Sequence, residues 1–174
     1  MLIDIGKFGI RDWQKGDALS IAKYANNKKI WKNLRDGFPH PYHFMDAENF
    51  LSLVFSQEPR TYFAIASNKE AIGSIGLGIG KDVHRFSAEL GFWLAEPFWN
   101  MGIMTKAIVR FTEFAFERFK LNRIYAEPYV TNPASARVLE KAGYILEGTL
   151  KANVYKDGRV LDQFLYAKVQ ENSE

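Results

Sequence analysis

Hydrophobic positions recur along the chain with two periods, one typical of strands and one typical of helices. The short apolar or alternating runs that favour strands occupy residues 7–14, 61–67, 71–79, 86–94, 123–130, 143–155 and 160–169. Apolar residues at helical spacing occupy residues 17–34, where two short helices are expected, and residues 45–55, 103–119 and 132–142. The order of these elements predicts an α/β (α+β) sandwich, with a mixed sheet and helices on its faces.

Three local signals refine this pattern. The pair Asp157-Gly158 lies between the last two apolar runs and predicts a closing hairpin. Pro128 interrupts the run 123–130 and predicts a bulge or an edge position there, because proline cannot donate to a strand ladder. Residues 35–44 contain two prolines, a glycine and several aromatic residues, and predict an irregular loop that either lines a pocket or covers the sheet.

Composition narrows the class of protein. The chain has 174 residues, 47% of them hydrophobic, which suits a single domain over residues 1–174. It has no cysteine, which excludes disulfides, thiolate metal sites and a cysteine nucleophile. A formal net charge of +3 is too small and too scattered to predict a nucleic-acid partner. No signal peptide or apolar run of membrane length is found, so we expect a cytoplasmic protein with no membrane partner.

The segment from Leu90 to Phe119 predicts a strand, a tight turn and a long helix, with Gly102 at the helix start. A helix N-terminus leaves about four backbone N–H groups without intrahelical partners. Asn100 is the one nearby side chain able to cap them; otherwise an anion such as a phosphate can do so. Neither GxGxxG nor GxxxxGK[ST] is present. The stretch alone leaves a plain turn and an anion site as equal alternatives.

A second helix start lies in VTNPASARVLEKAGY. Asn132 is a favoured N-cap, Pro133 is favoured at the first helical position, and Gly143 is a typical helix stop, so a plainly capped helix is the simplest interpretation. Asn132 also follows a strand end, however. Its amide could therefore face the same side of the sheet as the turn at Gly102, with Ser135 one helical turn further on.

Titratable residues offer few candidates for chemistry. Glu89 and Glu127 interrupt apolar strand patterns, and each is either a solvent-facing or paired carboxylate or a general base. The three histidines lie in or near loops at no metal-ligand spacing, and no metal site is expected.

The segments ELGFWLAEPFWNMGIMTKAI and LNRIYAEPYVTNPASARVLEKAGY, in this order of elements, resemble the GNAT superfamily of acetyl-CoA-dependent N-acetyltransferases, and in particular its RimJ/RimL-like branch. The resemblance covers nearly the whole chain. It implies a mostly antiparallel sheet, splayed between the strand ending at Leu94 and the strand ending near Tyr129, with about four helices. It also implies that the cofactor contacts are Phe92, Trp93, Leu94, Asn100, Met101, Gly102, Ile103, Met104, Thr105, Asn132 and Ser135.

The sequence departs from the family pattern at several positions. Only Gly102 remains of the usual glycine-rich turn, and Met104 stands where a smaller residue is usual. Lys106 replaces a common glutamate. Leu139 occupies the position of a tyrosine acid in many members, and the resemblance then implies that Ser135 stabilises the departing thiolate.

The resemblance implies direct transfer of an acetyl group from acetyl-CoA to a primary amine in a ternary complex, without an acyl-enzyme. Glu127 or Glu89 would be the general base, and a backbone N–H near Leu94 would meet the oxyanion. The acceptor is left open between a protein N-terminus and a small amine such as an amino acid, amino sugar, polyamine or antibiotic. A relative that binds acetyl-CoA without catalysis remains the alternative, and either a monomer or a homodimer is compatible.

Overall fold

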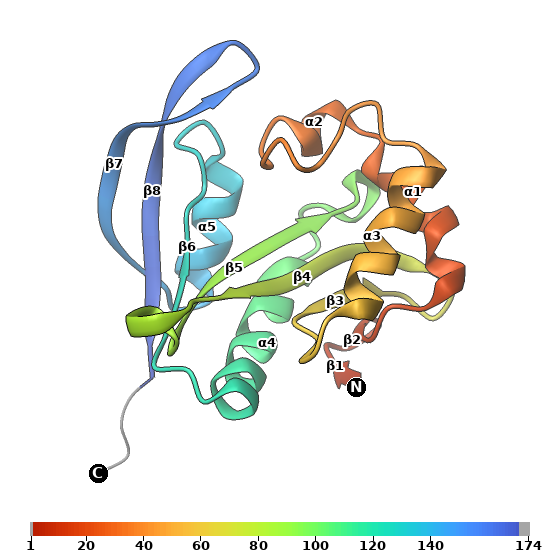
Figure 1. Cartoon of the computed structure of the whole chain (residues 1–174), viewed down its shortest axis with the longest axis horizontal. Helices are drawn as coiled ribbons and strands as arrows, with labels where there is room; N and C mark the ends of the chain where they lie inside the picture. Colours follow the sequence, from red (N-terminus) through yellow and green to blue (C-terminus); the bar gives the residue numbers. More distant parts are fainter. Residues whose placement is uncertain (1, 171–174) are drawn as a thin grey trace. The chain divides into compact units, whose positions relative to one another are not determined.

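The computed structural model describes residues 2–170, so both ends of the predicted range 1–174 lie outside the described part. The strands of this part are β1 (Leu2–Asp4), β2 (Gly9–Arg11), β3 (Tyr62–Ala66), β4 (Ala71–Ile79), β5 (Ser87–Leu94), β6 (Arg123–Ala126), β7 (Ile145–Lys156) and β8 (Arg159–Val169). Its α-helices are α1 (Ala18–Ala25), α2 (Lys28–Trp31), α3 (Phe44–Ser56), α4 (Ile103–Phe119) and α5 (Pro133–Lys141). Figure 1 shows these elements along the chain.

The strands form one sheet in the order β1-β2-β3-β4-β5-β6-β8-β7. Only β5 with β6 is parallel among the registered pairs of the described strands; the others are antiparallel. The pairs between β5 and β6 join Ser87–Glu89 to Arg123–Tyr125, at the beginning of both strands. A mixed, mostly antiparallel sheet with helices confirms the predicted fold class.

The chain divides into two compact units. The first contains residues 1–76 and 92–103, and the second contains residues 77–91 and 104–174. Both boundaries inside the sheet fall within strands, since β4 and β5 each contribute residues to both units. The single domain predicted from length stays a prediction.

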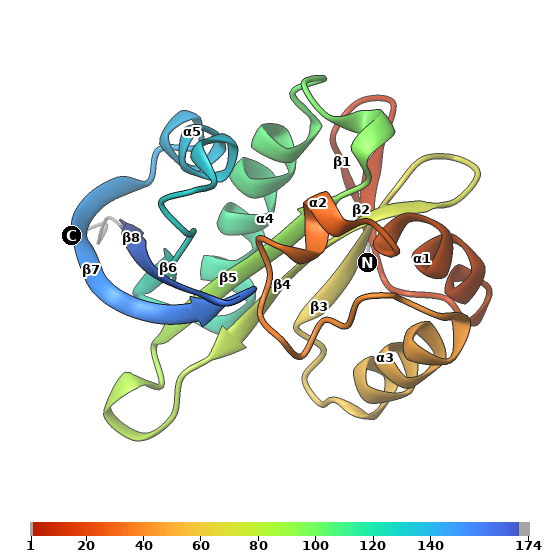
Figure 2. The same cartoon turned by 90° about the horizontal axis from the view of Figure 1, so that it is seen from above.

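In the first unit, α1 and α3 lie side by side (Figures 1 and 2). Ile21 and Ala25 of α1, and Leu51 and Val54 of α3, follow the i, i+3, i+4 spacing of an apolar helix face, and all four are buried. Tyr42, from the loop between α2 and α3, is buried in the same cluster. The predicted loop over residues 35–44 is thus anchored into a core.

In the second unit, α4 has the bounds that its periodicity predicts. Ala107, Ile108, Phe111 and Ala115 are fully buried, at the spacing of one helix face. Helix α5 begins after Asn132, whose side-chain oxygen accepts a hydrogen bond from the backbone N–H of Ser135. Both helices therefore form where the sequence pattern predicts a helix.

The structure corrects two strand predictions. The first run, expected as one strand over residues 7–14, contains only the short β2, which pairs with a β1 that the pattern did not reveal. The structure contradicts the bulge expected at Pro128; the edge position stays a prediction, because the described pairs of β5 with β6 end at Glu89 and Tyr125. β6 lies between β5 and β8, and its register with β8 continues unchanged from Arg123 to the bridge of Tyr129 with Gln163. The backbone N–H of Phe164 donates to the carbonyl of Pro128, so only the bond that proline cannot give is lost.

The closing hairpin turns at Asp157 and Gly158, which both have positive φ, as expected for a two-residue hairpin turn. β7 is the last strand of the sheet, and its pairing with β8 shifts register at Leu146/Gly148 and at Leu150/Val154. Large apolar side chains along it are exposed, including Ile145 and Tyr155. Within residues 2–170, no helix is both long and apolar enough to cross a membrane.

Candidate functional site

The turn that leads from β5 to α4 has an unusual backbone. Asn100 and Gly102 have φ of 61° and 72°, while Met101 between them is not left-handed. Such alternation directs successive backbone N–H groups to one side and forms a concavity that favours anions. Asparagine and glycine are the residues that adopt left-handed φ at least cost.

Asn100, which the sequence suggested as a cap for this helix, does not occupy its N-cap position. Because α4 begins at Ile103, the N-cap position belongs to Gly102, which has no side chain to cap with. A Cβ added to Gly102 would meet no atom within 4 Å, so the space beside it is open. The turn thus combines an uncapped helix start with free approach to its backbone.

The end of β5 presents its backbone alternately to two sides. Ala95 donates its N–H to the carbonyl of Ile72 on β4, and the carbonyl of Trp93 approaches Gly73 of β4. Because neighbouring residues of a strand point their backbone groups to opposite sides, Phe92 and Leu94 direct theirs away from β4. The Leu94 carbonyl accepts a hydrogen bond from the Trp99 indole at 2.7 Å. Two N–H groups and the Phe92 carbonyl therefore face the side where a further extended chain would pair.

The two candidate carboxylates lie on neighbouring strands of the second unit. Glu89 of β5 is the register partner of Tyr125 of β6. Because the register with β8 is regular through Pro128, Tyr125, Glu127 and Tyr129 share one strand face. Glu89 and Glu127 are both half-buried. The structure thus brings both onto one face of this part of the sheet.

The backbone of Glu127 is held by a buried glutamine that the sequence analysis did not single out. Gln163 of β8 donates its amide N–H to the Glu127 carbonyl at 2.7 Å. Its own amide oxygen accepts from Asn153 at 2.7 Å, and the residue is 4% exposed. The signal for this role was a polar residue at an apolar position of the run VLDQFLYAKV.

Asn132 and Ser135 form a reciprocal pair at the start of α5. The Ser135 N–H can only donate, so the oxygen of the Asn132 amide must face it, at 3.3 Å. The nitrogen of the same amide then donates to the Ser135 hydroxyl at 2.8 Å. The hydroxyl is therefore an acceptor in this bond, and no described residue accepts its hydrogen, which remains available to a ligand.

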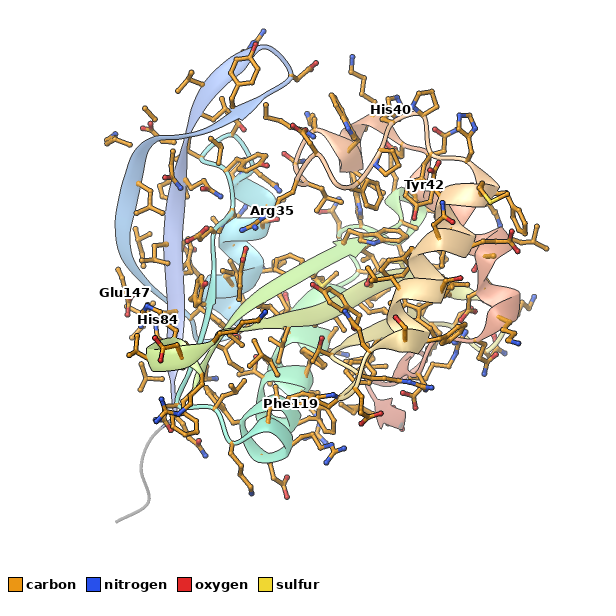
Figure 3. The ribbon with its side chains drawn as sticks, in the orientation of Figure 1. Arg35, His40, Tyr42, His84, Phe119 and Glu147 are labelled. Carbon is orange, nitrogen blue, oxygen red and sulfur yellow. The ribbon has the colours of Figure 1, made fainter. Side chains whose placement is uncertain are left out.

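Other predicted positions differ in exposure. Met101 is exposed, whereas Met104 is buried on the inner face of α4 and Thr105 is half-buried. Leu139 is fully buried in α5. The histidines are exposed; Figure 3 shows His40 on the loop between α2 and α3 and His84 on the connection between β4 and β5. In the part of the chain described, no three histidine or acidic side chains gather as a metal ion would require.

Aromatic side chains join the loop between α2 and α3 to the end of β5. The Phe38 ring lies 4.9 Å from the Tyr42 ring and 6.0 Å from the Trp93 ring, measured between centroids. Trp93 is flanked by Phe92 and Leu94, whose backbones face away from β4. The loop is thus packed against Trp93, which lies between the two residues whose backbone groups face away from β4.

We compared the chain with protein families and with known proteins. A family model described as an acetyltransferase (GNAT) domain matches residues 7–145. An uncharacterized N-acetyltransferase of Bacillus subtilis, YoaA, is 33% identical over 102 residues, which cover 59% of this chain and 57% of that protein. The ribosomal-protein-serine acetyltransferase of Escherichia coli is 31% identical over 107 residues, covering 62% and 59%. The matched part thus spans little more than half the length of these two relatives.

A more distant relative aligns over more of its length. The spermidine N(1)-acetyltransferase of Vibrio cholerae is 26% identical over 155 residues, 88% of this chain and 87% of that protein. The solved structure of RimL, a ribosomal L7/L12 alpha-N-protein acetyltransferase in complex with coenzyme A, superposes with a TM-score of 0.86 at 20% identity. It covers 97% of this chain and 98% of RimL, and shows the shared fold. Since the family model spans most of the sequence, this chain belongs to the GNAT acetyltransferase family.

Proposed function

We propose that this chain transfers an acetyl group from acetyl-CoA to the α-amino group at a protein N-terminus. The observation that carries the proposal is the turn from Asn100 to Gly102, where alternating backbone conformations and a helix start without a side-chain cap provide an anion site. A pyrophosphate matches that site, because the backbone N–H groups and the helix dipole both favour negative charge.

The residues of the chain fit the rest of acetyl-CoA as well. The open space beside Gly102 admits phosphate oxygens close to the backbone of residues 100–105. The outward N–H groups of Phe92 and Leu94 match the amide carbonyls of a pantetheine arm, as an added strand would. The Trp93 carbonyl approaches Gly73 of β4, so Trp93 contributes its ring, which packs against Phe38, rather than its backbone.

Bound acetyl-CoA supplies the acetyl group in activated form, as a thioester. Glu127, with Glu89 as the alternative, accepts the proton of the attacking amine, directly or through a water molecule. The Leu94 N–H, on the side of β5 away from β4, stabilises the oxyanion. The Ser135 hydroxyl, oriented by Asn132, donates a hydrogen bond to the departing sulfur and keeps its proton. An α-amine, with an ordinary pKa of about 8, needs less help from the base than a lysine.

The charge around residues 35–44, the aromatic loop between α2 and α3, favours a peptide over a polyamine as the acceptor. Residues 26–43 carry four cations, Lys28, Lys29, Lys32 and Arg35, of which Lys29 is paired with Glu96, and one acid, Asp36. Figure 3 shows Arg35 on this segment. A polyamine carries several positive charges and would be repelled, whereas a peptide N-terminus brings one at most. The Escherichia coli relative acts on a ribosomal-protein serine, which supports the same choice.

A small amine is the second candidate, because the Vibrio cholerae relative acetylates spermidine and aligns over 88% of this chain. Release of free thiol from acetyl-CoA distinguishes the two. We expect turnover with peptides that have a free N-terminus and none with the same peptides blocked at the N-terminus. Faster turnover with spermidine would contradict the acceptor assignment. Stabilisation by acetyl-CoA without turnover on any amine would contradict catalysis itself.

A further inference from the structure

Two adjacent asparagines at the joint between α1 and α2 hold two different parts of the first unit. The side-chain oxygen of Asn26 accepts a hydrogen bond from the backbone N–H of Tyr42 at 3.1 Å. The side-chain nitrogen of Asn27 donates to the Glu96 carboxylate at 2.7 Å. Tyr42 lies on the aromatic loop, and Glu96 lies in the short 3-10 helix Glu96–Phe98 that precedes the turn at Gly102.

A second hydrogen bond orients the Asn27 amide toward Glu96. The Asn27 oxygen accepts from the backbone N–H of Lys29 at 2.8 Å and caps α2, which fixes the amide nitrogen toward Glu96. The Lys29 ammonium also bonds the Glu96 carboxylate. These two partners, the ammonium first, hold the pKa of Glu96 below its ordinary value, so the carboxylate is ionised at neutral pH.

The segment that follows Glu96 is fixed in turn. The Phe98 ring lies 6.0 Å from both the Phe8 and the Tyr24 rings, and the Trp99 indole bonds the Leu94 carbonyl. The segment of residues 97–99, which joins Glu96 to the turn at Gly102, is therefore held by its own contacts. A displacement of Glu96 is expected to move this segment, and with it the turn.

The aromatic loop also contacts the end of β5, where Phe38 packs against Trp93. These contacts thus form a closed circuit that begins and ends on residues 93–96. It runs through Trp93, Phe38, Tyr42, Asn26, Asn27 and Glu96. Such a circuit links the position of the loop to the position of the turn.

We propose that Asn26 and Asn27 are positioning residues that couple cofactor binding at the turn to order in the aromatic loop, so that coenzyme A orders this loop before the amine binds. This inference rests on the proposed binding of coenzyme A at the turn. The loop needs no contact with the cofactor phosphates, because the coupling runs through Glu96 and the two asparagines.

Hydrogen exchange of the amides of residues 38–43, with and without coenzyme A, tests this coupling. In the wild-type chain we expect coenzyme A to slow exchange of the Tyr42 amide. Asn27→Ser keeps a capping oxygen for α2 but is too short to reach Glu96. We expect it to bind coenzyme A about 5-fold more weakly, a typical size for coupling between sites, and to lose the added protection of the loop.

Two further variants separate the halves of the circuit. Asn26→Ala should lose the added protection while Glu96 remains bound, and Asn26→Asp, which keeps an acceptor for the Tyr42 N–H, should restore it. Glu113→Gln removes an exposed carboxylate paired with Arg110 and serves as the control. Equal loop protection by coenzyme A in wild type, Asn27→Ser and Asn26→Ala would overturn the coupling. Failure of the wild type to bind coenzyme A would instead overturn the proposed function.

Discussion

Gly73 and Gly102 are constrained for opposite reasons. A Cβ on Gly73 would lie 2.5 Å from the Trp93 carbonyl oxygen, so a side chain there collides with the backbone of β5. A Cβ on Gly102 would meet nothing, but its φ of 72° strains any other residue except asparagine. The first glycine is needed for close packing of two strands, and the second for backbone conformation and access.

Gly73→Ala is therefore expected to push the end of β5 away from β4 and to weaken coenzyme A binding as well as folding. We expect an unfolding free energy lower by about 1–3 kcal/mol, the usual cost of overpacking. Gly78→Ala on the same strand is the matched control, because its Cβ would make an ordinary contact of 4.0 Å with Glu89. Urea unfolding and calorimetric titration with coenzyme A measure both effects. Equal losses in the two variants would contradict this reasoning.

Gly102→Ala is expected to cost about 1–2 kcal/mol through left-handed strain and to weaken coenzyme A binding by blocking the approach to the turn. Asn100→Gly relaxes the neighbouring left-handed residue without adding a side chain, so binding should be kept. Titration with coenzyme A compares the two. A tight complex with Gly102→Ala would show that phosphates do not approach this backbone.

Glu127→Gln, or Glu89→Gln if that residue is the base, should lower turnover about 10²-fold while leaving coenzyme A binding unchanged. Ser135→Ala should lower turnover less, because a hydroxyl only hydrogen-bonds the departing sulfur. Steady-state rates with an N-terminal peptide, beside titrations with coenzyme A, separate the two effects. Normal rates in both glutamine variants would remove the carboxylate base from the mechanism.

The sequence pattern predicted the elements whose formation depends on neighbouring residues alone. The bounds of α4 follow from its apolar spacing, and the hairpin turn at Asp157-Gly158 follows from residues that tolerate positive φ. The continuation of the β6–β8 register past Pro128 could not be predicted, because only the partner strand reveals it. The contact of Asn27 with Glu96 was hidden for the same reason, since it joins residues distant in sequence.

Gln163 shows how one strand fixes another. Gln163→Leu keeps the volume but removes the hydrogen bonds that Gln163 makes with the Glu127 carbonyl and the Asn153 amide. We expect a loss of about 1–3 kcal/mol in the free energy of unfolding, the usual net contribution of two hydrogen bonds. Gln170→Leu, at an exposed position just after β8, is the control and should change stability little. Urea unfolding of the two variants measures the difference, and equal stability would contradict the role of Gln163.

For the whole molecule, the important fact is that both unit boundaries inside the sheet cut through strands. Because β4 and β5 each supply residues to both units, neither unit has a full set of strands without the other. We expect a single calorimetric unfolding transition, with equal calorimetric and van't Hoff enthalpies. Two separated transitions would instead show that the units are independent domains, and would contradict the single domain predicted from length.

The shifts of register along β7 have a consequence for the chain in concentrated solution. A long outer strand with exposed apolar side chains is a template on which other chains can add strands and aggregate. The irregular stretches at Leu146/Gly148 and Leu150/Val154 interrupt that template twice. Charged residues stand beside both: Glu147, which is labelled in Figure 3 and bonded to Arg123, and Lys151, bonded to Asp162 at 2.9 Å. The strand thus remains apolar without offering a continuous edge for fibril growth.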